Sequence, residues 1–377
     1  MIEVLVLIFG LIGALFAWVI ISARRSLAYV FCNATISAWE ARLLSESRLM
    51  EFADAPKIMN VFSALEDTEY RAQLLEITKD EKVDIFAVER ALRESVNTRF
   101  RELLNMTPNV RKGTISRLLQ RVDLWNLKAI ITMIHNNVPV NQRLHGLLPS
   151  PIMSPQRLEI LASAEDLDRL LEFLKGSEYF DVISSTLGEY EKLGLIVLLS
   201  ALDKHYFTSL WKDVKSKRHQ RSILKSIVGY EIDSVNVKLI LRLKQEGVPR
   251  DEIDRYVVRP SYEINEAMLK AMIVAEDIRT AVHMIHITKY GKLLSDYISK
   301  IEKHGIPAAE RLLDEAYLKL CRWIEFTNFF GIAPMISFIK LKENEMKNLR
   351  SIIKLKADQV EPSKIKEKIK KVPKVEL

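Results

Sequence analysis

The chain has 377 residues, of which 48% are hydrophobic, so its length and composition exclude a disordered chain and allow two or three domains. Leu, Ile, Glu, Lys and Arg are abundant and only 12 Gly and 12 Pro are present, which favours helices over a turn-rich β fold and predicts an all-α protein. The net charge of +7 does not indicate nucleic-acid binding, because residues 363–377 hold six lysines and two glutamates with no aromatic residue among them to stack on bases.

The first 22 residues predict a transmembrane helix. Val4–Ser22 is a run of 19 uncharged and mostly apolar residues, long enough to cross a bilayer. A cleaved signal peptide is the alternative, but no Lys or Arg precedes the run and no small-x-small cleavage site stands out. Arg24 and Arg25 follow directly, so the positive-inside rule places the remaining chain on the cytoplasmic side of the cell membrane.

The rest of the chain contains a unit of about 110 residues that occurs three times. Each unit carries an acid, an Asn three residues later and a base two residues after that. The three sets are Asp123, Asn126 and Lys128; Asp233, Asn236 and Lys238; and Glu345, Asn348 and Arg350. Two further sets of residues repeat at nearly the same offset: Ser45, Ser154 and Asn265; and Tyr70, Tyr179 and Tyr290.

These landmarks divide the chain into a transmembrane segment at 1–22 and three helical repeats at 23–145, 146–257 and 258–362. We expect each repeat to form a small helical bundle, since its period exceeds that of the familiar solenoid modules. The Lys-rich residues 363–377 are expected to form a flexible tail, with attraction to anionic lipid or an acidic partner as the alternative.

Several of the repeated residues have local structural interpretations as helix caps. Ser45, Ser154 and Asn265 are good N-cap residues, each followed by a residue that suits the first helical position. Asp123 and Asp233 are likewise interpreted as N-caps, with the Asn three residues later reaching back as a capping-box partner would.

The far ends of the repeated helices also have a local explanation. Asn137 and Gly247 suit a left-handed position at the end of a helix. A proline follows shortly after each of them and prevents the helix from continuing.

The repeated bases are not explained by local structure. A cation in the second turn lies near the positive end of the helix dipole, which disfavours it by about 0.3–1 kcal/mol. We therefore expect an acid to face Lys128, Lys238 and Arg350, within this protein or on a partner. Together with Asn126, Asn236 and Asn348 they are the candidate residues for contacts between units or with a partner.

Signals for catalysis, cofactors or metals are nearly absent from the sequence. Lys112-Gly113-Thr114 lacks the preceding glycines of a phosphate-binding loop. His283 and His286 share a helix face, but no obvious third metal ligand lies beside them. We expect a non-catalytic protein without a cofactor, a metal, a small-molecule substrate or a nucleic-acid partner. Cys32 and Cys321 are expected to be core thiols.

From about Leu27 to about Val360 the chain resembles the C subunits of archaeal A-type and V-type rotary ATP synthases, the family that includes the d subunit of vacuolar ATPases. The resemblance rests on the three acid-Asn-base helices and on the opening helix Ser26–Leu44. It implies a funnel of three similar helical bundles with quasi-threefold symmetry, without catalytic activity. It further implies that the protein sits on the rotor ring in the membrane and receives the central stalk during ion-driven ATP synthesis.

A transmembrane segment departs from the family pattern, and we place it in the central hole of the ring. A transmembrane helix outside the ring would hold the body in place and prevent it from rotating with the ring. The alternative function is a membrane-anchored helical scaffold or tether unrelated to a rotor, for which an open arc of bundles is expected.

Overall fold

The computed structural model describes residues 2–74, 85–216 and 221–372. Within these ranges the chain is helical and contains no strand, as its composition predicted. The first helices are α1 Ile2–Glu40, α2 Glu46–Asp54, α3 Ile58–Leu65, α4 Arg71–Leu74, α5 Ile85–Met106, α6 Asn109–Leu119, α7 Arg121–His135, α8 Val140–Arg143 and the 3-10 helix η1 Leu144–Gly146. They are followed by α9 Pro155–Ala162, α10 Leu167–Leu174, α11 Glu178–Leu193, α12 Leu195–Ser216, α13 Arg221–Gln245 and α14 Arg250–Tyr256. The last are α15 Glu266–Val274, α16 Ile278–His283, α17 Lys289–Asp296, α18 Ile298–His304, α19 Ile306–Thr327, α20 Ala333–Ala357 and α21 Pro362–Lys368.

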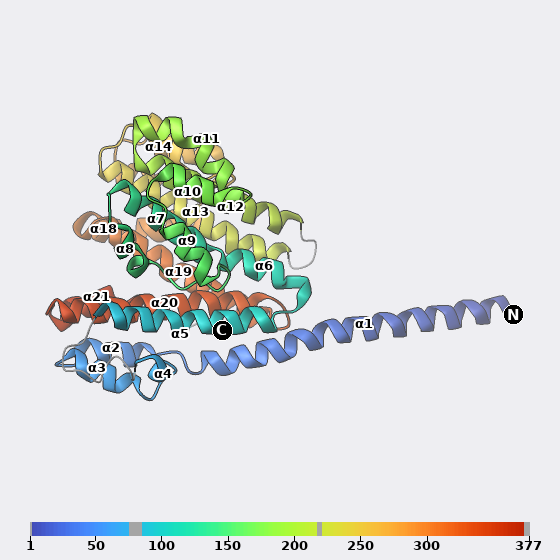
Figure 1. The fold of residues 1–377 in the computed structure, drawn as a ribbon. Helices are drawn as coiled ribbons and strands as arrows, with labels where there is room; N and C mark the ends of the chain where they lie inside the picture. Colours follow the sequence, from blue (N-terminus) through green and yellow to red (C-terminus); the bar gives the residue numbers. More distant parts are fainter. Residues whose placement is uncertain (1, 75–84, 217–220, 373–377) are drawn as a thin grey trace.

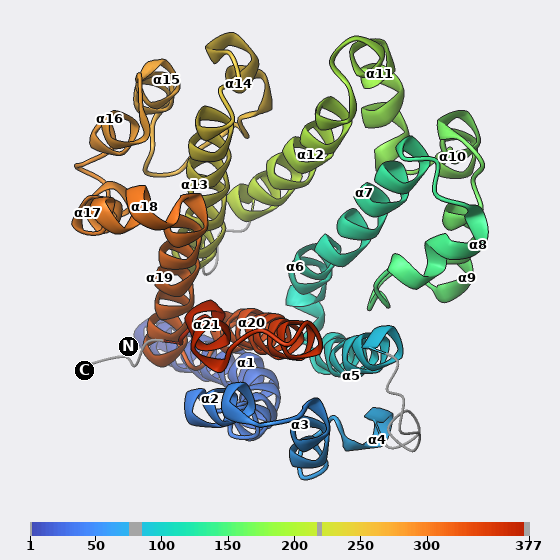
Figure 2. The ribbon, with the colours of Figure 1, turned by 90° about the vertical axis from the view of Figure 1, so that its left-hand side faces the viewer.

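Long helices follow one another in pairs at the same place in each predicted repeat. Helix α5 precedes α6 and α7, α12 precedes α13, and α19 precedes α20. These helices pack in cyclic order, with α7 on α12, α13 on α19 and α20 on α5. Figure 2 shows them around a common centre, with the shorter helices α8–α11, α14–α18 and α2–α4 on the outside. The last pair thus packs against the first, which is a closed arrangement and not an open arc.

The ends of the repeated helices have the local structure that their residue types favour. Ser45, Ser154 and Asn265 are the N-caps of α2, α9 and α15, and each side chain accepts a hydrogen bond from the backbone N–H three residues later. Asn137 and Gly247, which follow α7 and α13, have φ angles of 53° and 73° and so are left-handed, as predicted.

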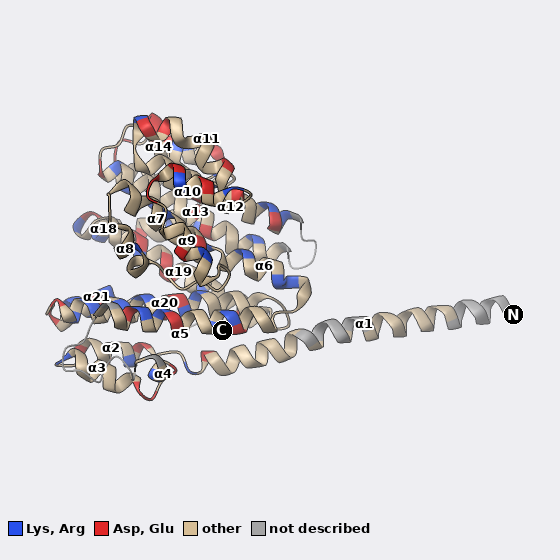
Figure 3. Cartoon of the chain, in the orientation of Figure 1, with Lys and Arg blue, Asp and Glu red and all other residues tan. Residues whose placement is uncertain are grey.

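Helix α1 joins the body through its C-terminal part. Cys32 and Ile36 are fully buried there, and the Nδ2 group of Asn33 donates hydrogen bonds to the backbone oxygens of Phe329 and Gly331. The N-terminal part of α1 extends away from the body (Figure 1), and residues 10–20 carry no charge (Figure 3).

The prediction of a transmembrane helix at Val4–Ser22 is wrong. Among the residues that the structure describes, no helix is both long enough and apolar enough to cross a membrane. The uncharged run is also not an element of its own, because α1 continues past Arg24 and Arg25 into residues that pack in the body. The predicted domain boundary between residues 22 and 23 therefore falls inside helix α1. Without a transmembrane segment among the described residues, the prediction that such a segment lies on the ring axis also fails.

The prediction of a flexible tail at 363–377 is also wrong for the part of the tail that is described, residues 363–372. Helix α21 contacts α2 and α20, and Ile365 and Ile369 are buried. The lysines that suggested a solvated tail alternate with these two isoleucines, which supply the apolar contact. Residues 373–377 lie outside the described part of the chain.

Candidate functional site: a central cavity enclosed by three equivalent joints

The three repeated Asn side chains make the same pair of hydrogen bonds. Each Nδ2 donates to the backbone oxygen, and each Oδ1 accepts from the backbone N–H, of the residue 22 positions later. The pairs are Asn126 with Leu148 at 2.8 and 2.7 Å, Asn236 with Val258 at 2.9 and 2.8 Å, and Asn348 with Lys370 at 2.8 and 2.9 Å. Each amide thus satisfies both polar groups of one residue, so the Asn residues fix an extended chain and are not capping-box partners.

The three repeated bases each form an ion pair with an acid on the first long helix of the next unit. Lys128 of α7 pairs with Asp203 of α12 at 2.6 Å, Lys238 of α13 pairs with Asp314 of α19, and Arg350 of α20 pairs with Glu89 of α5 at 2.9 Å. Burial would raise the pKa of Asp314, but the ammonium groups of Lys238 and Lys370 outweigh it and lower that pKa to about 2.

The repeated acids hold the chain just before the next capped helix. Asp233 accepts the backbone N–H groups of Tyr262, Glu263 and Ile264 at 2.8, 2.7 and 3.3 Å, immediately before the N-cap Asn265. Asp123 accepts the hydroxyl of Ser150, and Glu345 accepts the backbone N–H of Leu44 and the hydroxyl of Tyr70.

Asp123 and Asp233 are therefore not N-caps, contrary to the prediction. The N-cap of α7 is Gln120, and α13 already begins at Arg221, so both acids lie inside their helices. Burial raises the pKa of Asp123 to about 6, and the hydrogen bonds from Ser150 and Met153 oppose that rise.

Each set of three residues thus forms a joint between one unit and the segment that follows it. The first joint ties α7 to α12 and to the loop before α9, the second ties α13 to α19 and to the loop before α15, and the third ties α20 to α5 and to the loop before α2. Because the third joint returns to the first unit, the joints form a closed cycle.

A cluster of charges lies at the centre of the cycle, where the residues five positions before each repeated Asn meet. These residues are Arg121, Glu231 and Glu343. The guanidinium of Arg121 pairs with Glu231 and, at 2.6 Å, with Glu343. Burial would raise the pKa of Glu343, but the charges of Arg121 and Lys340 lower it to about 2. Aligning the three repeats did not reveal this cluster, because one of its residues is a base and the other two are acids. Their common position, five residues before the repeated Asn, was the signal that could have identified them.

Two adjoining cavities lie against this cluster. The larger has a volume of about 500 Å³ and lies between α5, α7, α12, α13 and α20, and the smaller, of about 240 Å³, lies between α7, α13, α19, α20 and Lys370. The apolar side chains of the larger cavity include Val96, Phe100, Trp125, Phe207 and Met346.

The charged walls of the two cavities carry more cations than acids. The cations are Arg93, Arg121, Lys128, Lys238, Lys340, Lys347, Arg350 and Lys370, and the carboxylates are Asp203, Glu231, Asp314 and Glu343. An excess of positive charge in an open cavity favours a partner with acidic groups.

The histidines and cysteines singled out in the sequence do not line the two cavities. No group of three or more His, Cys, Asp or Glu residues there is placed to hold a metal ion. The rings of His283 and His286 stack with centroids 4.9 Å apart, and Nδ1 of His286 bonds to the backbone oxygen of His283. Both cysteines are buried, and burial raises the pKa of Cys321 to about 12.

Comparison with known proteins places this geometry in context. Residues 32–368 match the model of the family described as ATP synthase (C/AC39) subunit. The chain is 28% identical to the C subunit of the A-type ATP synthase of Methanocaldococcus jannaschii, over 90% of this chain and 85% of the relative. It is 30% identical to the protein of the same name from Thermococcus gammatolerans, over 91% and 90%, and 27% identical to that from Pyrococcus horikoshii, over 95% of both.

Proposed function

Because the chain belongs to the ATP synthase (C/AC39) subunit family, and is therefore a non-catalytic subunit of an ATP synthase complex, we propose that it acts in the rotor of that complex. In this role it couples the rotor ring in the membrane to the central stalk during ion-driven ATP synthesis. The complex also holds it at the cytoplasmic side of the cell membrane.

The cycle of three joints is the observation that carries this proposal. A part that transmits torque must keep its shape under load, and close-packed helices resist deformation. Each joint combines a bidentate Asn contact, a helix-to-helix ion pair and an acid that holds the next segment. With the joints in a closed cycle, no unit has a free edge at which the body can open. The open arc expected for a simple tether is not the observed arrangement.

The central cavity is the candidate socket for the stalk. It lies where the three units meet, so a stalk segment seated there would contact all three. Its walls are predominantly apolar at positions such as Phe100, Trp125 and Phe207, which suits the burial of a helix end.

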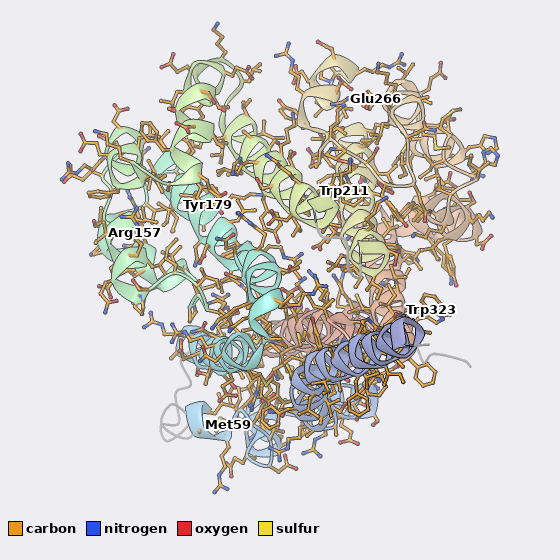
Figure 4. The ribbon with its side chains drawn as sticks, turned by 90° about the vertical axis from the view of Figure 1, so that its right-hand side faces the viewer. Met59, Arg157, Tyr179, Trp211, Glu266 and Trp323 are labelled. Atoms are coloured by element: carbon orange, nitrogen blue, oxygen red, sulfur yellow. The ribbon has the colours of Figure 1, made fainter. Side chains whose placement is uncertain are left out.

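A second surface is the candidate seat on the ring. Phe31 of α1, Trp323 and Phe326 of α19, and Phe330 of the following turn are 71%, 53%, 62% and 67% exposed. Figure 4 places Trp323 beside α1, and Asn33 of α1 bonds to the turn that contains Phe330. An apolar patch of this kind marks an interaction surface.

Crosslinking combined with ATP hydrolysis tests the rotor role. The variant Phe330→Cys, assembled into the complete ATP synthase, is expected to form a disulfide with cysteines engineered on the cytoplasmic loops of the ring. Because two parts of one rotor turn together, this crosslink should leave ATP hydrolysis unchanged. Crosslinks to the peripheral stator should stop hydrolysis.

The opposite pattern contradicts the proposal: hydrolysis lost on crosslinking to the ring and kept on crosslinking to the stator. Recovery of the tagged chain from detergent-solubilised membranes provides the control for assembly. Ring, stalk and catalytic subunits should be recovered together with it, whereas their absence favours a separate scaffold.

A further inference from the structure

One cation in the walls of the cavities has no partner in the described part of the chain. Among the described residues, the ammonium group of Lys347 on α20 makes no hydrogen bond, and no carboxylate oxygen lies within 4.0 Å of its Nζ atom. Each of the other seven cations in these walls forms an ion pair at 3.8 Å or less. Lys347 lines both cavities and is thus the available charge at their junction.

The groups around Lys347 come from four segments. They are Glu343 on α20 itself, Arg121 on α7, Asp314 on α19 and Lys370 in the C-terminal segment. Lys347 is exposed to solvent in the open cavity, but the protein atoms crowded around it lower its pKa to about 8 by desolvation, and Glu343 opposes this shift. The carboxylates of Glu343 and Asp314 are already paired with other cations, so neither is free to bind the ammonium group.

The position of Lys347 in the repeat shows what an entering segment meets. Lys347, Trp125 and Val235 each immediately precede the repeated Asn of their unit, and all three line the larger cavity. The equivalent positions therefore present one indole ring, one isopropyl group and one ammonium group to a common space. These three positions combine two apolar contacts with one unpaired charge.

We infer that the segment entering the cavity is an apolar helix end that carries one carboxylate, and that this carboxylate pairs with Lys347. The inference rests on the proposed coupling function and names the chemistry of the partner at that site. A helix is about 10–12 Å wide with its side chains and rises about 5.4 Å per turn, so about one turn fills a cavity of about 500 Å³. A nucleotide or phosphate binds best where several cations are unpaired, and the described walls hold one such cation.

Binding of the full chain to the purified central-stalk subunits of the same ATP synthase tests the inference. The variants are Lys347→Glu, Lys347→Arg and, as the matched control, Lys354→Glu, which changes an exposed lysine on α20 that lines neither cavity. The side chain of Lys347 is exposed in the open cavity of the free chain and would be covered only by the entering segment. Lys347→Glu is expected to weaken binding by about 30-fold or more, since it replaces an attraction by a repulsion in the bound state. Lys347→Arg and Lys354→Glu should bind like the unaltered chain.

Two further measurements sharpen the test. Affinity of the unaltered chain should fall as the pH rises above 8, because the ammonium form binds, whereas the affinity of Lys347→Arg should not fall. A Lys replacement of the matching acid on the stalk should restore binding to Lys347→Glu. Lys347→Arg should unfold at the same temperature as the unaltered chain, since it keeps the positive charge beside Glu343, and its unfolding is therefore the control for folding.

The outcomes separate this inference from the function on which it rests. If the unaltered chain binds the stalk and Lys347→Glu binds it as well as Lys354→Glu does, the inference is overturned and the proposed function stands. If the unaltered chain does not bind the stalk, the proposed function fails. Binding of ADP that depends on Lys347, measured by calorimetry, also overturns the inference and makes the cavity a small-anion site.

Discussion

Arg350 of α20 donates from Nε to Oε2 of Glu89 in α5 at 2.9 Å, and this contact joins the last repeated helix to the first unit. The equivalent bases Lys128 and Lys238 pair forward along the chain, to residues 75 and 76 positions later. Arg350 instead pairs with a residue 261 positions earlier. The same relation between neighbouring units therefore occurs three times and returns to its start.

The Asn contacts are expected to contribute more stability to the joints than the ion pairs. Asn236→Ala leaves the buried N–H and backbone oxygen of Val258 without partners, because Asn236 and Val258 are 0% and 1% exposed. We expect a loss of about 2–4 kcal/mol in the free energy of unfolding, measured with a chemical denaturant. The control Asn265→Ala removes only an exposed N-cap and should cost about 1 kcal/mol. Equal losses would contradict this ranking.

Removal of the ion pair that closes the cycle should have a small effect on the isolated chain. The side chain of Arg350 is 44% exposed, and exposed pairs contribute about 0–1 kcal/mol. We therefore expect Arg350→Ala to lower the free energy of unfolding by less than about 1 kcal/mol, and Asn348→Ala to lower it by more. A larger effect of Arg350→Ala would mean that the ion pair holds the third joint.

Acid should weaken the second joint through Asp314. The pKa of about 2 in the folded chain lies below the usual value near 3.9 for an unfolded chain, so this carboxylate contributes stability at neutral pH. The contribution, about 2 kcal/mol, is present above about pH 4 and is lost as the pH falls towards 2. Unfolding between pH 3 and 6 should show a shallower acid loss for Asp314→Asn than for the unaltered chain. Parallel curves would contradict this assignment.

The C-terminal segment is expected to be part of the folded body. A chain that ends at Val360 loses the buried Ile365 and Ile369 and the Lys370 partner of Asn348. Burial of an isoleucine contributes about 1.5–3 kcal/mol, so we expect a loss of about 4 kcal/mol or more in thermal or denaturant unfolding. Lys364→Ala, which changes an exposed residue of α21, provides the control and should unfold like the full chain. If the truncation at Val360 were without effect, the packing of α21 would contribute no stability.

Local signals in the sequence predicted the parts of this fold that depend on neighbouring residues. Ser45, Ser154 and Asn265 cap helices through atoms three residues away, and Asn137 and Gly247 adopt the left-handed conformation that their side chains allow. An acid is bonded to each repeated base, as expected. The helix-dipole reason for that expectation was wrong, because Lys238 and Arg350 lie in the middle of α13 and α20 and not in a second turn.

Roles that depend on distant partners could not be deduced from spacing alone. The acid of the third unit, Glu345, accepts from Leu44, which lies 301 positions away, and nothing near Glu345 in the sequence indicates this contact. Asp123 and Asp233 were mistaken for caps because the starts of their helices were placed too late. Composition alone gave wrong predictions at both ends of the chain: a transmembrane helix from an uncharged run and a flexible tail from a Lys-rich run. Each run belongs to a helix that packs on the body, α1 and α21 respectively.

The central claim is that three joints close the body around a cavity that receives the central stalk, and a photo-crosslinker placed at Trp125 tests it most directly. Trp125 lines the cavity, whereas Trp323 lies on the outer apolar patch and provides the matched control. In the assembled ATP synthase, the account predicts crosslinks from position 125 to the central stalk and from position 323 to the ring. Crosslinks from position 125 only to the ring or to the peripheral stator would contradict it.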